Sequence, residues 1–190
     1  MMDRSWLALT EEAAIEPELQ IVDPHHHMWD TETVYGRYEL DDLRLDTNAG
    51  HNVVETVFID CGANYRPSGP AHLRPVGESE YICGRADESD DTPGARIAAI
   101  VSHADLSLGS AVAEVLEAHV EAAGGRFRGI RHAGARVDDP AVPVSRVQPP
   151  AGLYATPEFL AGAETLASMG LSFEAWQYHP QLAEVEALAA

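Results

Sequence analysis

Lysine is absent from this sequence of 190 residues, so its 12 basic side chains other than histidine are all arginines. This absence excludes a Schiff-base lysine, a phosphate-loop lysine and a carboxylated lysine that bridges two metal ions. The chain would therefore bind one metal ion or none. Cationic surface is scarce as well, because 31 acidic residues bring the formal net charge to −19. Nucleic acids and anionic membranes both need cationic surface, so we expect neither as a partner.

Cysteines are few and long apolar runs are absent. Two cysteines, Cys61 and Cys83, do not make a disulfide framework. No stretch approaches the roughly 18 apolar residues of a membrane span, and the acidic first 20 residues lack the basic start and apolar run of a secretory signal. We therefore expect a cytoplasmic protein with reduced thiols. Hydrophobic residues still make up 45% of the chain, which is enough to form a core.

Short apolar segments alternate with helical patterns after a polar lead-in over residues 1–18. The expected strands cover residues 19–23, 53–59, 96–101, 127–131 and 171–178. The expected helices cover residues 40–49, 78–88, 110–123, 157–169 and 181–190. This alternation is typical of βα units around a parallel sheet, and it leaves a doubly wound sheet and a (β/α)₈ barrel both open.

Two regions that contain proline interrupt this pattern. Pro24 follows the first apolar segment, so we expect it to end a short buried strand. A loop of more than twenty residues, with Pro140 and Pro143 among its prolines, follows the fourth expected strand. Loops of that length in compact domains are usually functional or disordered.

The densest cluster of chemically active side chains is the run DPHHHMWD at residues 23–30. Residues two apart on an extended chain point the same way, so His25 and His27 should share one direction and His26 should face the other. Two imidazoles on one side provide half of a tetrahedral metal site, or a paired cationic contact for a substrate carbonyl. A histidine-rich surface loop is the alternative interpretation.

The run DPHHHMWD resembles the DxHxH signature that opens the amidohydrolase-related (amidohydrolase 2) family, and more narrowly its branch of sugar-acid and pyrone-dicarboxylate lactonases. Three further segments agree in order and spacing: residues 53–60, the run FRGIRH at 127–132 and the run GLSFEAWQYHPQL at 170–182. The similarity spans residues 19–190, which we take as one amidohydrolase-like barrel domain. Proteins of this family are (β/α)₈ TIM barrels, whose active sites lie at the carboxyl ends of the strands.

The resemblance implies a catalytic and metal-ligating set of three histidines. His25 and His27 would be joined by His179, at the end of the fifth expected strand, around one divalent ion such as zinc or manganese. Some members of the family act without a metal. The implied reaction is hydrolysis of a lactone or a similar cyclic ester or amide by an activated water.

The resemblance also implies contacts with a small anionic substrate. Arg131, at the end of the fourth strand, would hold a substrate carboxylate. Tyr178, Trp29 and His132 are further candidates for substrate contact. Neighbouring residues of a strand point to opposite faces, so we expect one of Arg131 and His132, and one of Tyr178 and His179, to face the site.

Other polar side chains fit structural roles better. His103 and Asp105 follow the third expected strand and are expected in a solvated loop. His119 lies on the apolar face of a helix, where a packed histidine is expected. Cys61 is expected to be a small buried residue rather than a nucleophile.

The number of βα units departs from the family pattern. The family also has a histidine on the sixth strand and an aspartate, the general base, on the eighth. This chain has five units, so at about 30 residues a unit roughly 90 residues are missing. We therefore expect an incomplete barrel: a fragment of a longer protein, one of two chains that complete each other as a homo-oligomer, or a non-catalytic half-barrel that is stable only through association.

Overall fold

A computed structural model describes residues 8–10, 12–33, 36–139, 141–142 and 148–190 of the chain. Five parallel strands in the order β1-β2-β3-β4-β5 form one sheet: β1 (Gln20–His26), β2 (Asn52–Ile59), β3 (Arg96–Ser102), β4 (Phe127–Ala133) and β5 (Ser172–Trp176). Helices follow the strands in turn: α2 (Leu40–Thr47), α3 (Val76–Asp90), α4 (Val112–Ala122), α5 (Pro157–Ser168) and α6 (Leu182–Ala189). The predicted parallel sheet with alternating helices is confirmed.

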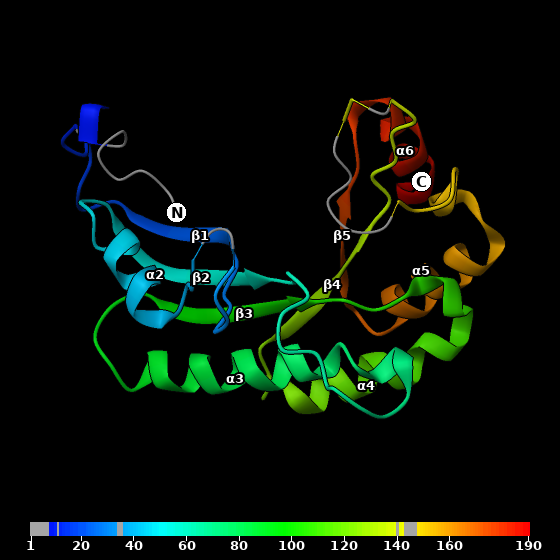
Figure 1. Cartoon of the computed structure of the whole chain (residues 1–190), viewed down its shortest axis with the longest axis horizontal. Coiled ribbons are helices and arrows are strands. Elements are labelled where there is room, and N and C mark those ends of the chain that lie inside the picture. Colours follow the sequence, from blue (N-terminus) through cyan, green and yellow to red (C-terminus); the bar gives the residue numbers. More distant parts are fainter. Residues whose placement is uncertain (1–7, 11, 34–35, 140, 143–147) are drawn as a thin grey trace.

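The sheet curls along its length (Figure 1). Strands β1, β2 and β3 lie side by side, β4 turns away from them, and β5 stands nearly across their direction. In the described part of the chain, β1 pairs only with β2 and β5 only with β4, so the sheet does not close. The fold is a curled half-barrel with one open side.

The core lies between the outer face of the sheet and helices α3, α4 and α5. Its fully buried side chains come from β2, β3 and β4 and from the three helices: Phe58, Ile97, Ile100, Ile130, Ile82, Val115, Leu116 and Phe159. Burying each such side chain stabilises the fold by about 1.5–3 kcal/mol before chain entropy is subtracted. This packing holds the strands in register, and with them the side chains at the strand ends.

Strand β1 differs from its prediction. It continues through Pro24 to His26, and its pairing with β2 shifts register between Asp23 and His26. The expectation that Pro24 ends a buried strand is wrong, because β1 lies at the edge of the sheet, where a residue without an N–H is tolerated. Edge position also explains why Val22 is 53% exposed.

Helix α5 begins as its sequence predicts. The Thr156 side chain accepts a hydrogen bond from the Phe159 backbone N–H at 3.3 Å, and Pro157 is the first helical residue. Gly170 follows the helix with a φ of +70°, a conformation that favours glycine. Helix α4 is shorter than expected, because the 3₁₀ helix η3 (Leu106–Ala111) occupies its first turn.

Parts of two predicted segments lie outside the described residues. These parts are residues 1–7 and 11 of the lead-in, and Pro140, Pro143 and residues 144–147 of the loop after β4. Among the helices that the structure does describe, none has the length and apolar character needed to cross a bilayer.

Candidate active site

A cavity of about 1080 Å³ opens at the carboxyl ends of the strands. Side chains that follow all five strands line it, as expected for the catalytic end of a barrel. They include His25, His27, Trp29, Asp60, Cys61, His103, Asp105, Arg131, His132, Trp176 and Tyr178. The strand ends thus bring together residues that are more than 100 positions apart in the sequence.

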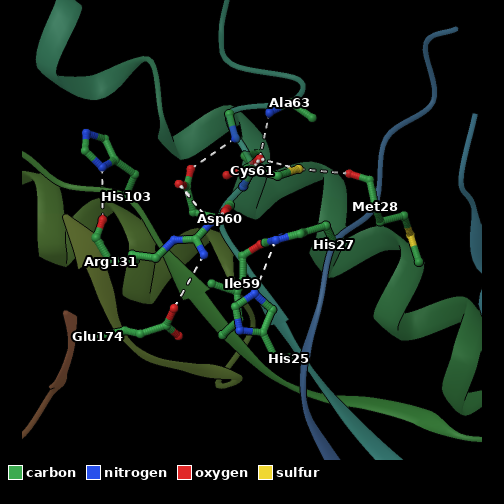
Figure 2. Close-up of polar contacts among 12 residues, drawn as sticks. His25, His27, Met28, Ile59, Asp60, Cys61, Ala63, His103, Arg131 and Glu174 are labelled. Atoms are coloured by element: carbon green, nitrogen blue, oxygen red, sulfur yellow. Dashed lines mark hydrogen bonds and ion pairs between the residues drawn. The ribbon is translucent and has the colours of Figure 1, made fainter. Parts of the chain in front are cut away.

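His25 and His27 face one another where the end of β1 lines this cavity (Figure 2). Their Nε2 atoms are 3.2 Å apart, and their rings are nearly perpendicular. His27 Nδ1 lies 2.7 Å from the Ile59 carbonyl oxygen, which can only accept a hydrogen bond. Nδ1 therefore carries the proton, and Nε2 presents a lone pair toward His25. His26 packs on the opposite side against Phe58, which confirms the predicted alternation.

The Nε2–Nε2 separation, here that of a hydrogen bond, is also compatible with two ligands of a single divalent ion. At zinc–nitrogen distances of 2.0–2.1 Å, tetrahedral geometry separates two nitrogens by about 3.3 Å, close to the observed 3.2 Å. Burial lowers the pKa of His27 and so favours the neutral, ligating form. No set of three metal-ligating side chains occurs within the described ranges, so this pair would provide two ligands.

His179 does not join the pair. Strand β5 ends at Trp176, and His179 lies exposed in the short 3₁₀ helix η5 (His179–Gln181). Its neighbour Tyr178 lines the cavity instead. The Gln181 side chain fixes this turn, because its amide accepts from the Tyr178 N–H and donates to the Gly134 carbonyl.

Arg131 lies across three strand ends (Figure 2). Its guanidinium donates to the Asp60 backbone carbonyl, lies 3.8 Å from the Asp60 carboxylate and is 3.4 Å from Glu174 Oε1. The guanidinium also covers the ring of Trp176 at 5.9 Å. Arg131 therefore forms ion pairs inside the barrel mouth while it lines the cavity.

Asp60 is a cavity residue to which the sequence analysis assigned no role. Its carboxylate is buried and accepts hydrogen bonds from the Gly62 N–H and the Tyr65 hydroxyl. Burial opposes ionisation of Asp60, but the adjacent Glu78 carboxyl, the hydrogen bond from Tyr65 and the charge of Arg131 outweigh it and lower the pKa. Its position directly after β2 could have identified it, because strand ends form the site of a barrel.

Glu78, on the first turn of α3, was also missed. Its side chain is 1% exposed, and Oε1 accepts from the backbone N–H groups of Cys61 and Ala63. Burial, together with the charge of Asp60, raises the pKa of Glu78 to about 9. Glu78 is therefore protonated at neutral pH beside ionised Asp60. The two carboxyl groups together carry one negative charge.

Cys61 keeps the inert role predicted for it. Its thiol lies 3.4 Å from the Met28 carbonyl and 3.5 Å from Glu78 Oε1. Burial, and the nearby Glu78, raise the pKa of this thiol to about 12. A thiol that stays protonated is a poor nucleophile.

His103 is placed differently from its prediction. It is partly buried and lines the cavity, and its Nδ1 is 3.0 Å from the Arg131 carbonyl oxygen. The expectation that His103 lies in a solvated loop is wrong, because the backbone of β4 holds the ring. Asp105 is 52% exposed at the cavity edge, where it accepts from the Ser107 N–H.

His132 and Arg131 point to opposite faces of β4, as alternation requires. His132 packs against His103 and Phe159, and its Nδ1 accepts from the Leu106 backbone N–H at 3.2 Å. Both neighbours nevertheless line the cavity, because it extends beyond the strand ends over η3. His119, in contrast, is completely buried on α4, as predicted.

Trp29 forms part of the cavity wall. Its indole N–H donates to the Gly36 carbonyl, and its backbone pairs with Tyr38 in an isolated bridge. The ring therefore has a fixed position in the cavity lining. Substrate contact by Trp29 stays a prediction.

Solved amidohydrolases share this fold. An amidohydrolase from Burkholderia multivorans with bound zinc matches with a TM-score of 0.59 at 20% identity over 87% of this chain, and a second crystal form with bound HEPES matches with a TM-score of 0.58 at 21% identity over 88%. Amidohydrolase 2 from Bifidobacterium longum subsp. infantis matches with a TM-score of 0.52 at 18% identity over 90%. The half-barrel thus matches part of the fold of these amidohydrolases.

The chain is shorter than the proteins that it matches. It covers 52% of each Burkholderia chain and 56% of the Bifidobacterium chain. The uncharacterized protein y4mH of Sinorhizobium fredii (strain NBRC 101917 / NGR234) is 30% identical over an alignment of 198 positions, gaps included, that covers 90% of this chain and 58% of that protein. No protein-family model matches the chain.

Proposed function

We propose that the chain carries part of the active site of an amidohydrolase-related hydrolase, which opens a lactone or a similar cyclic ester or amide with an activated water. The observation that carries this proposal is the His25–His27 pair, whose Nε2 atoms lie 3.2 Å apart at the mouth of the half-barrel. The zinc in the Burkholderia amidohydrolase supports a metal-assisted reaction. The lactonase branch rests on the motifs at residues 23–30, 127–132 and 170–182.

His25 and His27 would hold one zinc or manganese ion through Nε2. When bound, such an ion supplies Lewis acidity and makes a water nucleophilic at neutral pH. The chain's own side chains position the substrate: Trp29 and Tyr178 form walls of the cavity, and Arg131 provides the cation. Glu174 is the more exposed of the two acidic partners of Arg131, so a substrate carboxylate would replace Glu174 there.

We further propose that residues 19–190 form the first five βα units of the barrel of a cytoplasmic protein. The remaining metal ligand and the general base would then come from outside these units. The alternative function is a non-catalytic half-barrel that is stable only through association. Its support is the open side of the sheet, together with Val22 at 53% and Trp176 at 43% exposure.

An assay of sugar-acid lactone hydrolysis tests the proposed reaction. The released acid is measured with and without added Zn²⁺ or Mn²⁺. We expect turnover only when residues from outside these units complete the site, and a chelator should then remove the turnover and the added ion restore it. In the same assay Arg131→Met should raise KM about tenfold for lactones that carry a carboxylate, because a charge-assisted contact is lost. If the chain sediments as an oligomer and shows no turnover, the result would instead support the non-catalytic half-barrel.

A further inference from the structure

A second pair of histidines lines the cavity, and backbone groups fix the proton positions on both rings. His103 Nδ1 faces the Arg131 carbonyl, which only accepts, so this nitrogen carries the proton (Figure 2). His132 Nδ1 faces the Leu106 N–H, which only donates, so this nitrogen carries the lone pair. In a neutral imidazole the other nitrogen has the opposite role. His103 Nε2 is therefore an acceptor, and His132 Nε2–H is a donor.

These two free nitrogens belong to adjacent rings. The ring centroids of His103 and His132 are 5.3 Å apart at an interplanar angle of 77°. Within the part of the chain that the structure describes, neither Nε2 has a hydrogen-bond partner. Neither nitrogen is fully buried, so a ligand can reach it. Burial lowers the pKa of His132 to about 4, which keeps that ring neutral at physiological pH.

We propose that His103 and His132 form a subsite for neutral hydroxyl groups of the ligand. A hydroxyl both donates and accepts, so it matches an acceptor nitrogen beside a donor N–H. A carboxylate would accept from His132 but meet the lone pair of His103, and Asp60 and Asp105 line the same cavity. This subsite rests on the proposed function in so far as the ligand is the substrate of that site.

The subsite would recognise the part of the ligand remote from the reacting carbonyl. His25 and His27 come from β1, whereas His103 and His132 follow β3 and end β4. Strand β2 separates the two pairs in the sheet, and both line the same cavity. A substrate whose carbonyl lies at the first pair would thus present its ring substituents to the second.

Binding of three six-membered lactams, which resist hydrolysis, tests the subsite by calorimetry. D-gluconolactam carries hydroxyl groups, δ-valerolactam carries none, and 6-oxopiperidine-2-carboxylate carries a carboxylate. We expect the gluconolactam to bind at least about tenfold more tightly than δ-valerolactam, the difference that corresponds to about 1.4 kcal/mol of hydrogen bonding. The carboxylate compound reports separately on Arg131. Equal affinities, or no binding of gluconolactam, would overturn the subsite.

Asparagine variants remove the free nitrogens and keep the backbone contacts. In His103→Asn the amide N–H can still donate to the Arg131 carbonyl, and in His132→Asn the amide oxygen can still accept from Leu106. Each variant should lose about tenfold in gluconolactam affinity and bind δ-valerolactam as before. His51→Asn, at an exposed loop position, is the matched control. Unchanged gluconolactam binding in both variants would refute the proposal.

Lactone hydrolysis and lactam binding separate the two proposals. Selective gluconolactam binding without lactone turnover would contradict the hydrolase and leave the subsite supported. Turnover with no preference for hydroxylated ligands would contradict the subsite alone. Imidazole ¹⁵N shifts give a further check, because His103 should show the Nδ1–H tautomer and His132 the Nε2–H tautomer.

Discussion

Two histidine pairs in one cavity have similar ring geometry and different chemistry. The His25–His27 rings are 4.8 Å apart at 84°, and the His103–His132 rings are 5.3 Å apart at 77°. In the first pair the two Nε2 atoms point at each other. In the second pair each Nδ1 is bound to the backbone and each Nε2 is left for a ligand.

Backbone anchors account for the difference between the pairs. A carbonyl or an N–H beside one ring nitrogen decides whether the other nitrogen accepts or donates. In the functions proposed above, the carbonyl that binds His27 suits the first pair to a cation, and the two backbone contacts of the second pair suit it to a neutral hydroxyl. The comparison shows that ring geometry alone does not assign a histidine site.

The largest expected difference between the two pairs is their contribution to the affinity for Zn²⁺. His27→Ala removes one of two ligating nitrogens, so we expect the affinity for Zn²⁺ to fall by about 100-fold or more. His103→Asn should leave the affinity within about twofold, because His103 does not contribute to that pair. Calorimetric titration of the two variants measures both constants. Equal losses would show that the pairs act as one metal site.

The pH dependence of the free energy of unfolding tests the carboxyl pair of Asp60 and Glu78, which lies between the histidine pairs. An unfolded glutamate releases its proton above a pKa of about 4.5, whereas buried Glu78 keeps it up to about 9. The folded state thus binds more protons in this window, and the contribution of Glu78 to the free energy of unfolding falls as pH rises through it.

Glu78→Gln isolates that contribution. Glutamine keeps an acceptor for the N–H groups of Cys61 and Ala63, and it does not titrate. Urea unfolding between pH 5 and 9 should show a smaller decline for this variant than for the wild-type chain. A decline of the same size in both would mean that Glu78 is ionised in the folded protein.

Sequence patterns predicted the directions of the histidines better than their partners. Alternation along a strand fixes that His25 and His27 share a side, because this depends on neighbours in the sequence. Glu78 and His103 depend on contacts across 17 and 28 positions, with Cys61 and Arg131 respectively. An acid in the first turn of a helix normally indicates an exposed terminus, so nothing local marked Glu78 as buried.

The fifth strand shows the same limit. The alternation of βα units predicted β5, but its end was placed at Tyr178, two residues too late. Gln181 determines the turn, because its amide joins Tyr178 to Gly134 at the end of β4. That contact is tertiary, and it leaves His179 exposed.

Titration of His132 is the finest test of the difference between the pairs. Burial, reinforced by His103, lowers the pKa of His132 to about 4, so the folded state binds fewer protons than the unfolded state between pH 4 and 6.5. Stability should therefore decline as pH falls through this window. His26 and His119 share the effect, so residue-resolved ¹⁵N shifts are needed to isolate His132.

Those shifts should stay constant for His132 from pH 7.5 to 5 and change only near pH 4. Protonation would place an N–H on Nδ1 against the Leu106 N–H, so the donor of that backbone contact would lose its acceptor. If His132 instead titrates near 6.5, the ring is a double donor in mildly acidic solution. The second pair would then favour anions there, and its contrast with the first pair, for which we propose a cation, would rest on charge rather than on fixed tautomers.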